Sequence, residues 1–193
     1  MTTRRRALLA IVLVVLSLIA ACGIPKDSHP RLIAEEPEGF NTSTQPTIGV
    51  GGLEVHVYLI DGQADPLKLA ARKRPTTQQP GPLEAVAALL LGLTKDDDVQ
   101  GYQTKIPQGT QLRDDSKVDG KLVTIDLSSE ISTISAQNAV QAYAQLVYTA
   151  TQYPSGPSQV QFLTEGKPIN AQTDAATKSV VGRSDYRSLA PKS

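Results

Sequence analysis

One cysteine, Cys22, limits how this chain of 193 residues can fold. Because there is no second cysteine, the folded part can form no internal disulfide, and burial and hydrogen bonds must stabilise it. The chain has no tryptophan and only two phenylalanines, which predicts a core of leucine, valine, isoleucine and alanine. The lack of tryptophan also excludes a carbohydrate site built from stacked indole rings.

The residues before Cys22 have the layout of an export signal. Met1 to Arg6 are largely basic, and residues 7–21 form an apolar run that ends in small side chains. This run is shorter than the roughly 20 residues that a membrane-spanning helix needs. We therefore predict that residues 1–21 are a signal peptide, exported by either the Sec or the twin-arginine route.

The end of this signal also predicts a lipid anchor. Ile19-Ala20-Ala21-Cys22 resembles the bacterial lipobox, in which the cysteine is acylated and becomes the first residue of the mature chain. Two or three acyl chains hold a protein durably on a membrane, whereas a single chain holds it only marginally. We expect acylated Cys22 to sit in the lipid bilayer on the extracytoplasmic face of the cell membrane. The alternative is a signal anchor in which Cys22 is a buried thiol.

Prolines mark the stretch that follows the anchor. Residues 22–48 have neither the period of a strand nor that of a helix, and they contain Pro25, Pro30, Pro37 and Pro46. This segment is predicted to be a flexible tether that lifts the rest of the chain from the membrane. Residues 49–193 are long enough for a single domain with a C-terminal tail, because most domains have about 100 to 150 residues.

The charge of the exported chain argues against nucleic acid as a partner. Once Arg4, Arg5 and Arg6 leave with the signal, 16 basic and 19 acidic residues remain. Proteins that bind nucleic acid carry clustered lysine and arginine to neutralise phosphates. We expect no nucleic-acid partner.

Alternating side chains predict strands. Residues 53–60 alternate apolar with more polar side chains, which is typical of a strand with one buried face. Asp61-Gly62 supplies turn chemistry, so a second strand within residues 66–74 is expected to complete a hairpin. Further strands or short extended segments are expected at residues 102–106, from 112 onward, at 121–127, at 159–164 and at 165–169.

Two segments repeat apolar residues at helical spacing. The first lies between Pro80 and Leu93, and the second runs from Ala136 to Gln152 with Ser135 as its predicted N-cap. The second helix is expected to turn its amide side chains outward, namely Gln137, Asn138, Gln141, Gln145 and Gln152. The order is β-α-β-β-α-β. We predict an α+β fold, a two-layer sandwich with two main helices on one face of a mixed β-sheet.

Two groups of polar residues are candidate sites. Asp96-Asp97-Asp98 lacks the alternating ligands and central glycine of a calcium-binding EF-hand loop, so we expect a solvated loop there and no metal site. Asp126, Ser128, Ser129 and Glu130 converge at a predicted strand end, where they are a candidate ligand or contact site. The alternative for these four residues is turn and helix-capping chemistry.

The chain offers little material for catalysis. Acylation of Cys22 leaves no thiol, and the only histidines are His29 in the tether and His56 in the first strand. A Ser-His-Asp arrangement would therefore have to use His56. We predict that the protein is not an enzyme and uses no cofactor.

Several segments, taken in their order and spacing, resemble the GerMN domain, the sporulation and spore-germination module of bacterial envelope lipoproteins. The resemblance spans most of residues 50–170 and rests on Val57 to Asp61, Glu84 to Leu93, Ile106 to Leu112, Val123 to Glu130, Ala144 to Thr149 and Val160 to Pro168. Arg183-Ser184-Asp185-Tyr186 resembles a common ending of the family, so the tail is expected to pack on the domain.

This resemblance implies a noncatalytic extracytoplasmic module that serves envelope or sporulation assemblies, with another envelope protein as its partner. The alternative is a module that binds cell-wall glycan or peptide near Asp126. Docking on a protein predicts an exposed apolar patch or an unpaired strand. Ligand binding predicts a cleft with convergent polar groups at the strand end.

Overall fold

The computed structural model describes residues 52–192. The signal peptide, acylated Cys22 and the tether, predicted for residues 1–48, lie outside the described residues and stay predictions. Within residues 52–192 no helix is both long and apolar enough to cross a membrane.

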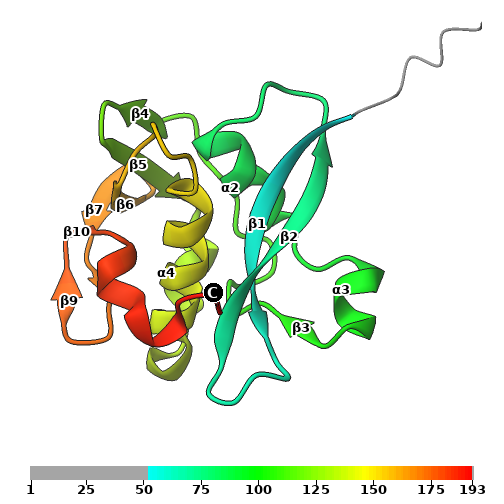
Figure 1. The fold of residues 1–193 in the computed structure, drawn as a ribbon. Helices are drawn as coiled ribbons and strands as arrows, with labels where there is room; N and C mark the ends of the chain where they lie inside the picture. The colour runs from blue at the N-terminus through cyan, green and yellow to red at the C-terminus, as the bar shows by residue number, and fades with distance from the viewer. Residues whose placement is uncertain (1–51, 193) are drawn as a thin grey trace, which may run out of the picture. The chain divides into compact units, whose positions relative to one another are not determined.

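A long β-hairpin opens the described part of the chain (Figure 1). Strand β1, Leu53–Asp61, pairs antiparallel with β2, Lys68–Thr76, along its whole length. The short strand β3, Tyr102–Gln103, pairs with the end of β1 at Ile60 and Asp61. The hairpin predicted from the alternating pattern is therefore present, with Val55, Val57 and Leu59 buried on one face.

A second sheet is built from the later strands. Its order is β10-β6-β5-β4, and β7 pairs with the remaining part of β6. The central strands β5 and β6 run parallel, and helix α4 connects them along the chain. The strands are β4 Lys117–Asp119, β5 Leu122–Leu127, β6 Gln159–Thr164, β7 Lys167–Ile169 and β10 Val180–Val181. A separate pair consists of β8 Ala171–Gln172 and β9 Thr177–Lys178.

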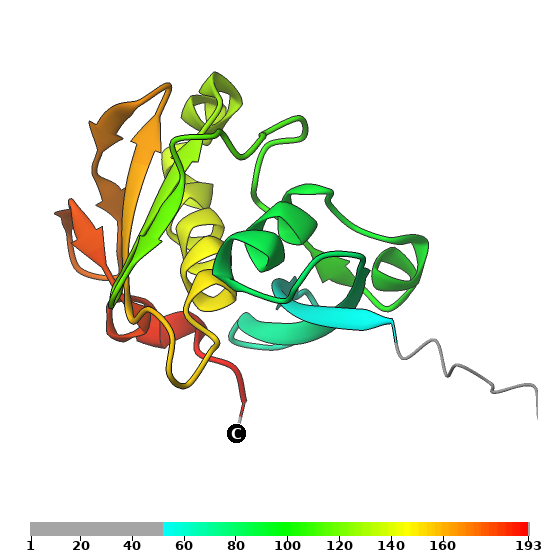
Figure 2. The same cartoon turned by 90° about the horizontal axis from the view of Figure 1, so that it is seen from above.

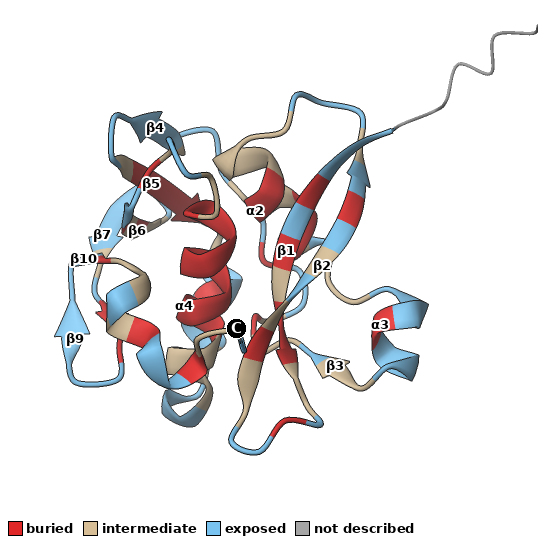
Figure 3. Ribbon diagram, viewed as in Figure 1, coloured by how far each residue is buried: buried red, intermediate tan, exposed pale blue. Residues whose placement is uncertain are grey.

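The helices fill the space around these sheets. They are α2 Pro82–Leu90, α3 Lys95–Val99 and α4 Ala136–Ala150, with 3-10 helices η1 at Ser129–Thr133 and η2 at Arg183–Leu189. Figures 1 and 2 show α4 between the hairpin and the five-stranded sheet. Most of α4 and β5 is buried (Figure 3). The α+β class is thus confirmed.

The strands form two main sheets rather than the one mixed sheet that we predicted, and α4 is the reason. Two side chains of α4, and that of Gln152 just beyond its end, bond to the backbone of β1 on the side away from β2. Thr149 Oγ1 accepts from Tyr58 N at 3.0 Å, and Gln145 Nε2 donates to Tyr58 O at 3.2 Å. Gln152 Nε2 donates to His56 O at 2.7 Å. These side chains take the place of a neighbouring strand, because buried backbone groups require partners.

Gln145 is the clearest exception to the predicted outward face of α4. It is fully buried, and its Oε1 also accepts from Lys105 N at 2.9 Å. The expectation that this side chain points outward was wrong, because the backbone groups of two other segments use it as their partner.

The C-terminal tail packs on the domain, as expected. Tyr186 is fully buried, and burial of its ring raises the pKa of its hydroxyl. Arg183 lies over the ring of Tyr148, 4.8 Å from the centroid, and donates to Tyr148 O at 2.9 Å. These contacts fix η2 against α4.

Candidate functional site

The strand end at Asp126 is organised by its own hydrogen bonds. Asp126 is the penultimate residue of β5 and is fully buried. Its two carboxylate oxygens accept from Gly166 N at 3.0 and 3.1 Å, and Arg113 Nε lies 3.5 Å from Oδ2. Gly166 has a φ of +75°, which favours glycine and turns the chain from β6 into β7. Asp126 thus joins this turn to the segment around Arg113.

Glu165 extends this network to Ser129. Arg113 Nη1 lies 3.2 Å from Glu165 Oε2, and Ser129 N donates to Glu165 Oε1 at 3.1 Å. The structure therefore brings Asp126 and Ser129 into one network through Arg113 and Glu165, which our sequence prediction had missed. Glu165 lies in the turn after β6 and Arg113 in the loop before β4, and neither segment has a periodic pattern that would have pointed to the network.

Ser128 and Glu130 serve a different segment. Ser128 Oγ accepts from Gln111 N at 2.9 Å, and Glu130 is exposed beside Gly109. The Ser128 hydroxyl lowers the pKa of Glu130. The geometry of all four residues favours turn and capping chemistry, and a ligand role for them stays a prediction.

The acidic run on α3 is only partly solvated. Asp96 and Asp98 are exposed, but Asp97 is fully buried, where it pairs with Arg72 and Arg74 of β2 and caps α3 together with Thr94. The expected solvated loop is therefore wrong at Asp97, because two guanidinium groups make burial of its carboxylate favourable. Within residues 52–192 no group of three metal-ligating side chains is present.

Burial alone raises the pKa of Asp97, but its bonds to Thr94 and its pairing with Arg74 and Arg72 outweigh burial and lower it. His56, which a Ser-His-Asp arrangement would have to use, lies exposed on β1.

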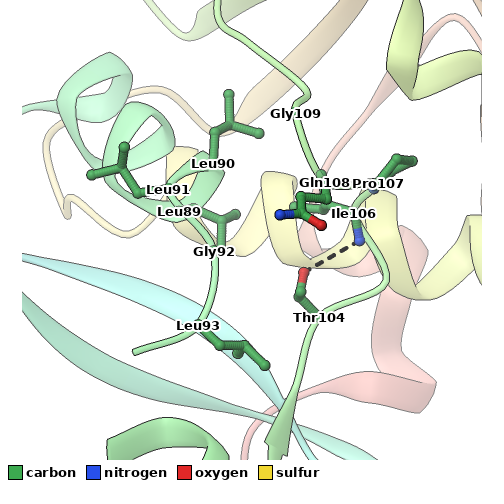
Figure 4. A pocket seen from close by; sticks show the side chains of 10 residues that line it. All are labelled: Leu89, Leu90, Leu91, Gly92, Leu93, Thr104, Ile106, Pro107, Gln108 and Gly109. Atoms are coloured by element: carbon green, nitrogen blue, oxygen red, sulfur yellow. Dashed lines mark hydrogen bonds between the residues drawn. The ribbon is translucent and has the colours of Figure 1, made fainter. Parts of the chain in front are cut away.

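A series of hollows lies along α2, and we refer to it as the α2 groove. One hollow, of about 400 Å³, lies between the end of α2 and residues 104–109, and its lining side chains are drawn in Figure 4. A second, of about 530 Å³, shares Leu90, Leu91 and Gly109 with the first. A third, of about 420 Å³, continues past Ala87 and Leu112 to the start of α2. A fourth, of about 240 Å³, shares Leu91 and Leu93 with the first.

The end of α2 explains this shape. Gly92 has a φ of +85° and donates its N–H to Leu89 O at 3.0 Å, which closes the helix. A helix turns by about 100° per residue, so consecutive leucines cannot all face the core. Leu89 is buried, Leu90 is half-buried, and Leu91 has 87% of its surface exposed. Leu91 therefore projects between the hollows.

The sequence prediction found α2 but not the groove. It placed Leu83, Val86, Ala87, Leu90 and Leu93 on one apolar stripe, whereas the buried residues of α2 are Ala85, Val86, Ala88 and Leu89. The sequence pattern that could have revealed the groove is the unbroken run Leu89-Leu90-Leu91, followed by Leu93. One face of a helix cannot bury all four of these leucines.

Residues 56–170 match the family model of Germane, described as sporulation and spore germination. This match covers more than half of the chain. The chain belongs to the Germane family. The resemblance to the GerMN domain is thereby confirmed.

Two solved structures of the sporulation protein GerM from Bacillus subtilis are similar to this Germane protein. Its tandem GerMN domains are 17% identical with a TM-score of 0.53, and the match covers 69% of this chain and 47% of that one. The first GerMN domain is 18% identical with the same TM-score of 0.53, over 69% of this chain and 99% of that one. This chain thus spans about half the length of the tandem structure. The comparison with curated proteins gave no match.

The Germane match contains both surfaces described above. The α2 groove and the strand end at Asp126 lie within residues 56–170, whereas η2 lies beyond them. At 17% and 18% identity the two GerM structures show the fold alone.

Proposed function

We propose that this Germane protein is a lipid-anchored, noncatalytic module on the extracytoplasmic face of the cell membrane, and that it docks another envelope protein in the α2 groove. The observation that carries the proposal is Leu91, 87% exposed among hollows whose linings combine aliphatic side chains with a few uncharged polar ones. The predicted location at the membrane rests on the lipobox-like residues before Cys22.

The composition of the groove favours an apolar protein segment as its occupant. The two largest hollows beside Leu91 are lined by no charged side chain. A glycan site needs convergent hydrogen-bonding groups, whereas a groove of this kind suits the apolar face of an amphipathic helix. Burying one exposed leucine side chain contributes about 1.5 to 3 kcal/mol, so Leu91 and Leu90 would be central to the interface.

The strand end at Asp126 is less suited to docking or ligand binding. Its carboxylate is buried and already bonded to Gly166 and Arg113, so a ligand would have to displace these contacts. Buried hydrogen bonds of charged groups are costly to break. The wall-ligand alternative therefore receives less support than the groove.

The test is site-specific photo-crosslinking in intact cells that make the full chain. A photoreactive residue is placed at Leu91 or, as a matched control, at Val99 on α3, whose exposure of 85% is nearly the same. We expect Leu91 to give one envelope protein as its adduct, identified by mass spectrometry and confirmed by a reciprocal crosslink from that protein. Val99 should give none.

Two further outcomes decide against the proposal or part of it. Equal adducts from Leu91 and Val99 would contradict docking in the groove. Adducts that contain wall glycan or peptide, and that form from Ser129 rather than Leu91, would support the ligand-binding alternative. Cys22→Ala tests the predicted membrane location, because the adduct should disappear when the lipid anchor is lost.

A further inference from the structure

We propose that the outer edge of β2 accepts an extended, acidic segment of a partner protein as an added strand. This surface is distinct from the α2 groove and goes beyond the docking function proposed above. It rests on the backbone of β2 and on the charge of its side chains.

One edge of β2 is open. The strand pairs with β1 on one side, and no other described strand lies along its second side. In an antiparallel pair, residues directly opposite each other point their backbone groups either both inward or both outward. Tyr58 of β1 bonds outward, to Thr149 and Gln145 of α4. Its partner Ala71 therefore directs its N–H and C=O away from β1.

The same alternation makes Lys73 an outward residue, because it pairs with His56, whose C=O bonds to Gln152. Lys73 O accepts from the side chain of Arg74 at 3.0 Å, which leaves the N–H of Lys73 for a new strand. Both Ala71 and Lys73 are exposed. The open part of the edge thus offers three backbone groups in the spacing of a strand.

The limits of this edge are also clear. Pro75 has no N–H to donate, and Leu69 is buried near η2, where Lys68 Nζ donates to Ser188 O at 2.8 Å. A partner strand is therefore short and centred on residues 71–73.

Charge selects the chemistry of the occupant. Within nine residues β2 carries Lys68, Arg72, Lys73 and Arg74. Arg72 and Arg74 are already paired with Asp96 and Asp97 of α3, so Lys73 is the cation most open to an added strand. A second copy of this strand would bring another cationic edge against Lys73, and charged edges of this kind oppose self-pairing. Acidic side chains would meet complementary charge, most directly at Lys73.

Lys73 is free to change partner. Its Nζ lies 2.8 Å from Glu54 Oε2, but the two side chains are 66% and 47% exposed. Such solvated pairs contribute little to stability, so a carboxylate of an added strand can replace Glu54 without a large penalty. Ala71, with its small side chain, leaves room for the approaching backbone.

The experiment measures binding of a synthetic acidic peptide, in which glutamate alternates with valine, to the full chain. We expect saturable binding that protects the amides of Ala71 and Lys73 from hydrogen exchange. Ala71→Pro removes the outward N–H and should weaken binding by about tenfold, whereas Ala71→Thr keeps that N–H and should bind normally.

Further controls keep the result decisive. A peptide with lysine in place of glutamate should not bind, and Lys73→Glu should weaken binding of the acidic peptide. If Ala71→Pro fails to fold, a peptide N-methylated on its bonding edge gives the same test on the unaltered protein. Equal binding of acidic and basic peptides, or protection at residues 89–93 instead, would overturn the proposal. Leu91→Glu should leave peptide binding unchanged, so failure of the groove and failure of this edge can be told apart.

Discussion

The side chain of Gln145 donates a hydrogen bond from Nε2 to the backbone oxygen of Tyr58 at 3.2 Å, and its Oε1 accepts from Lys105 N at 2.9 Å. One buried amide on α4 therefore holds both β1 and the segment after β3. This arrangement keeps the hairpin apart from the five-stranded sheet.

Gln145→Leu should destabilise the fold by about 2 to 4 kcal/mol, because it leaves two backbone groups without partners. Urea denaturation measures this change. Gln141→Leu is the matched control one helical turn earlier, where the buried Oε1 has no partner within the described residues. It should be neutral or stabilising. A loss from Gln141→Leu as large as that from Gln145→Leu would contradict this account.

Asp97 should make the free energy of unfolding depend on pH in the acidic range. Its folded pKa lies below that of the unfolded chain, so its contribution is complete above the ordinary carboxyl pKa of about 3.9 and is lost as the pH falls through the folded value. Asp97→Asn should cost about 3 kcal/mol at neutral pH, and this difference from wild type should shrink on acidification. Asp98→Asn, on the exposed side of α3, keeps Asp97, so its free energy of unfolding should follow that of wild type in denaturation measured across pH.

Asp126→Ala tests whether the strand end is structural. The Gly166 N–H loses its acceptor and Arg113 loses a buried partner, so we expect a loss of about 2 kcal/mol in the free energy of unfolding. Glu165→Ala breaks only a half-exposed pair with Arg113 and one backbone bond, and should cost less than half as much. An Asp126→Ala variant of unchanged stability would instead favour a ligand role for this carboxylate.

Cys22 carries the prediction of the membrane address. We expect the mature chain to begin at Cys22, to carry acyl chains there by mass spectrometry, and to enter the detergent phase on partitioning. Cys22→Ala should stay in the aqueous phase or keep its signal. A wild-type chain with a free thiol at Cys22 would contradict the anchor.

Periodicity was a sound guide where burial alone decides the structure. The alternation in β1 and the apolar spacing of α2 and α4 placed these elements, since each buries one face against the core. Polarity predicted exposed side chains at Gln145 and Asp97, and both are buried. Their burial depends on partners far away in the sequence, such as Tyr58 and Arg74. No local pattern contains that information.

The same reasoning explains why the groove was missed while the strand end was found. Asp126 and its neighbours stand out as polar residues after an apolar strand, although the bonds that satisfy them come from Gly166 and Arg113. Leu91 looks like a core residue in sequence, and only the helical turn that buries Leu89 shows that Leu91 must project outward.

The most direct test of docking in the groove is the affinity of the crosslinked partner for two charge-insertion variants of the full chain, Leu91→Glu and Val99→Glu. Both residues are about equally exposed, so both variants should unfold within roughly 0.5 kcal/mol of wild type. We predict that Leu91→Glu lowers the affinity at least about tenfold, since a charge would enter an apolar interface, while Val99→Glu leaves it unchanged. Equal affinities for the two variants would contradict docking in the α2 groove.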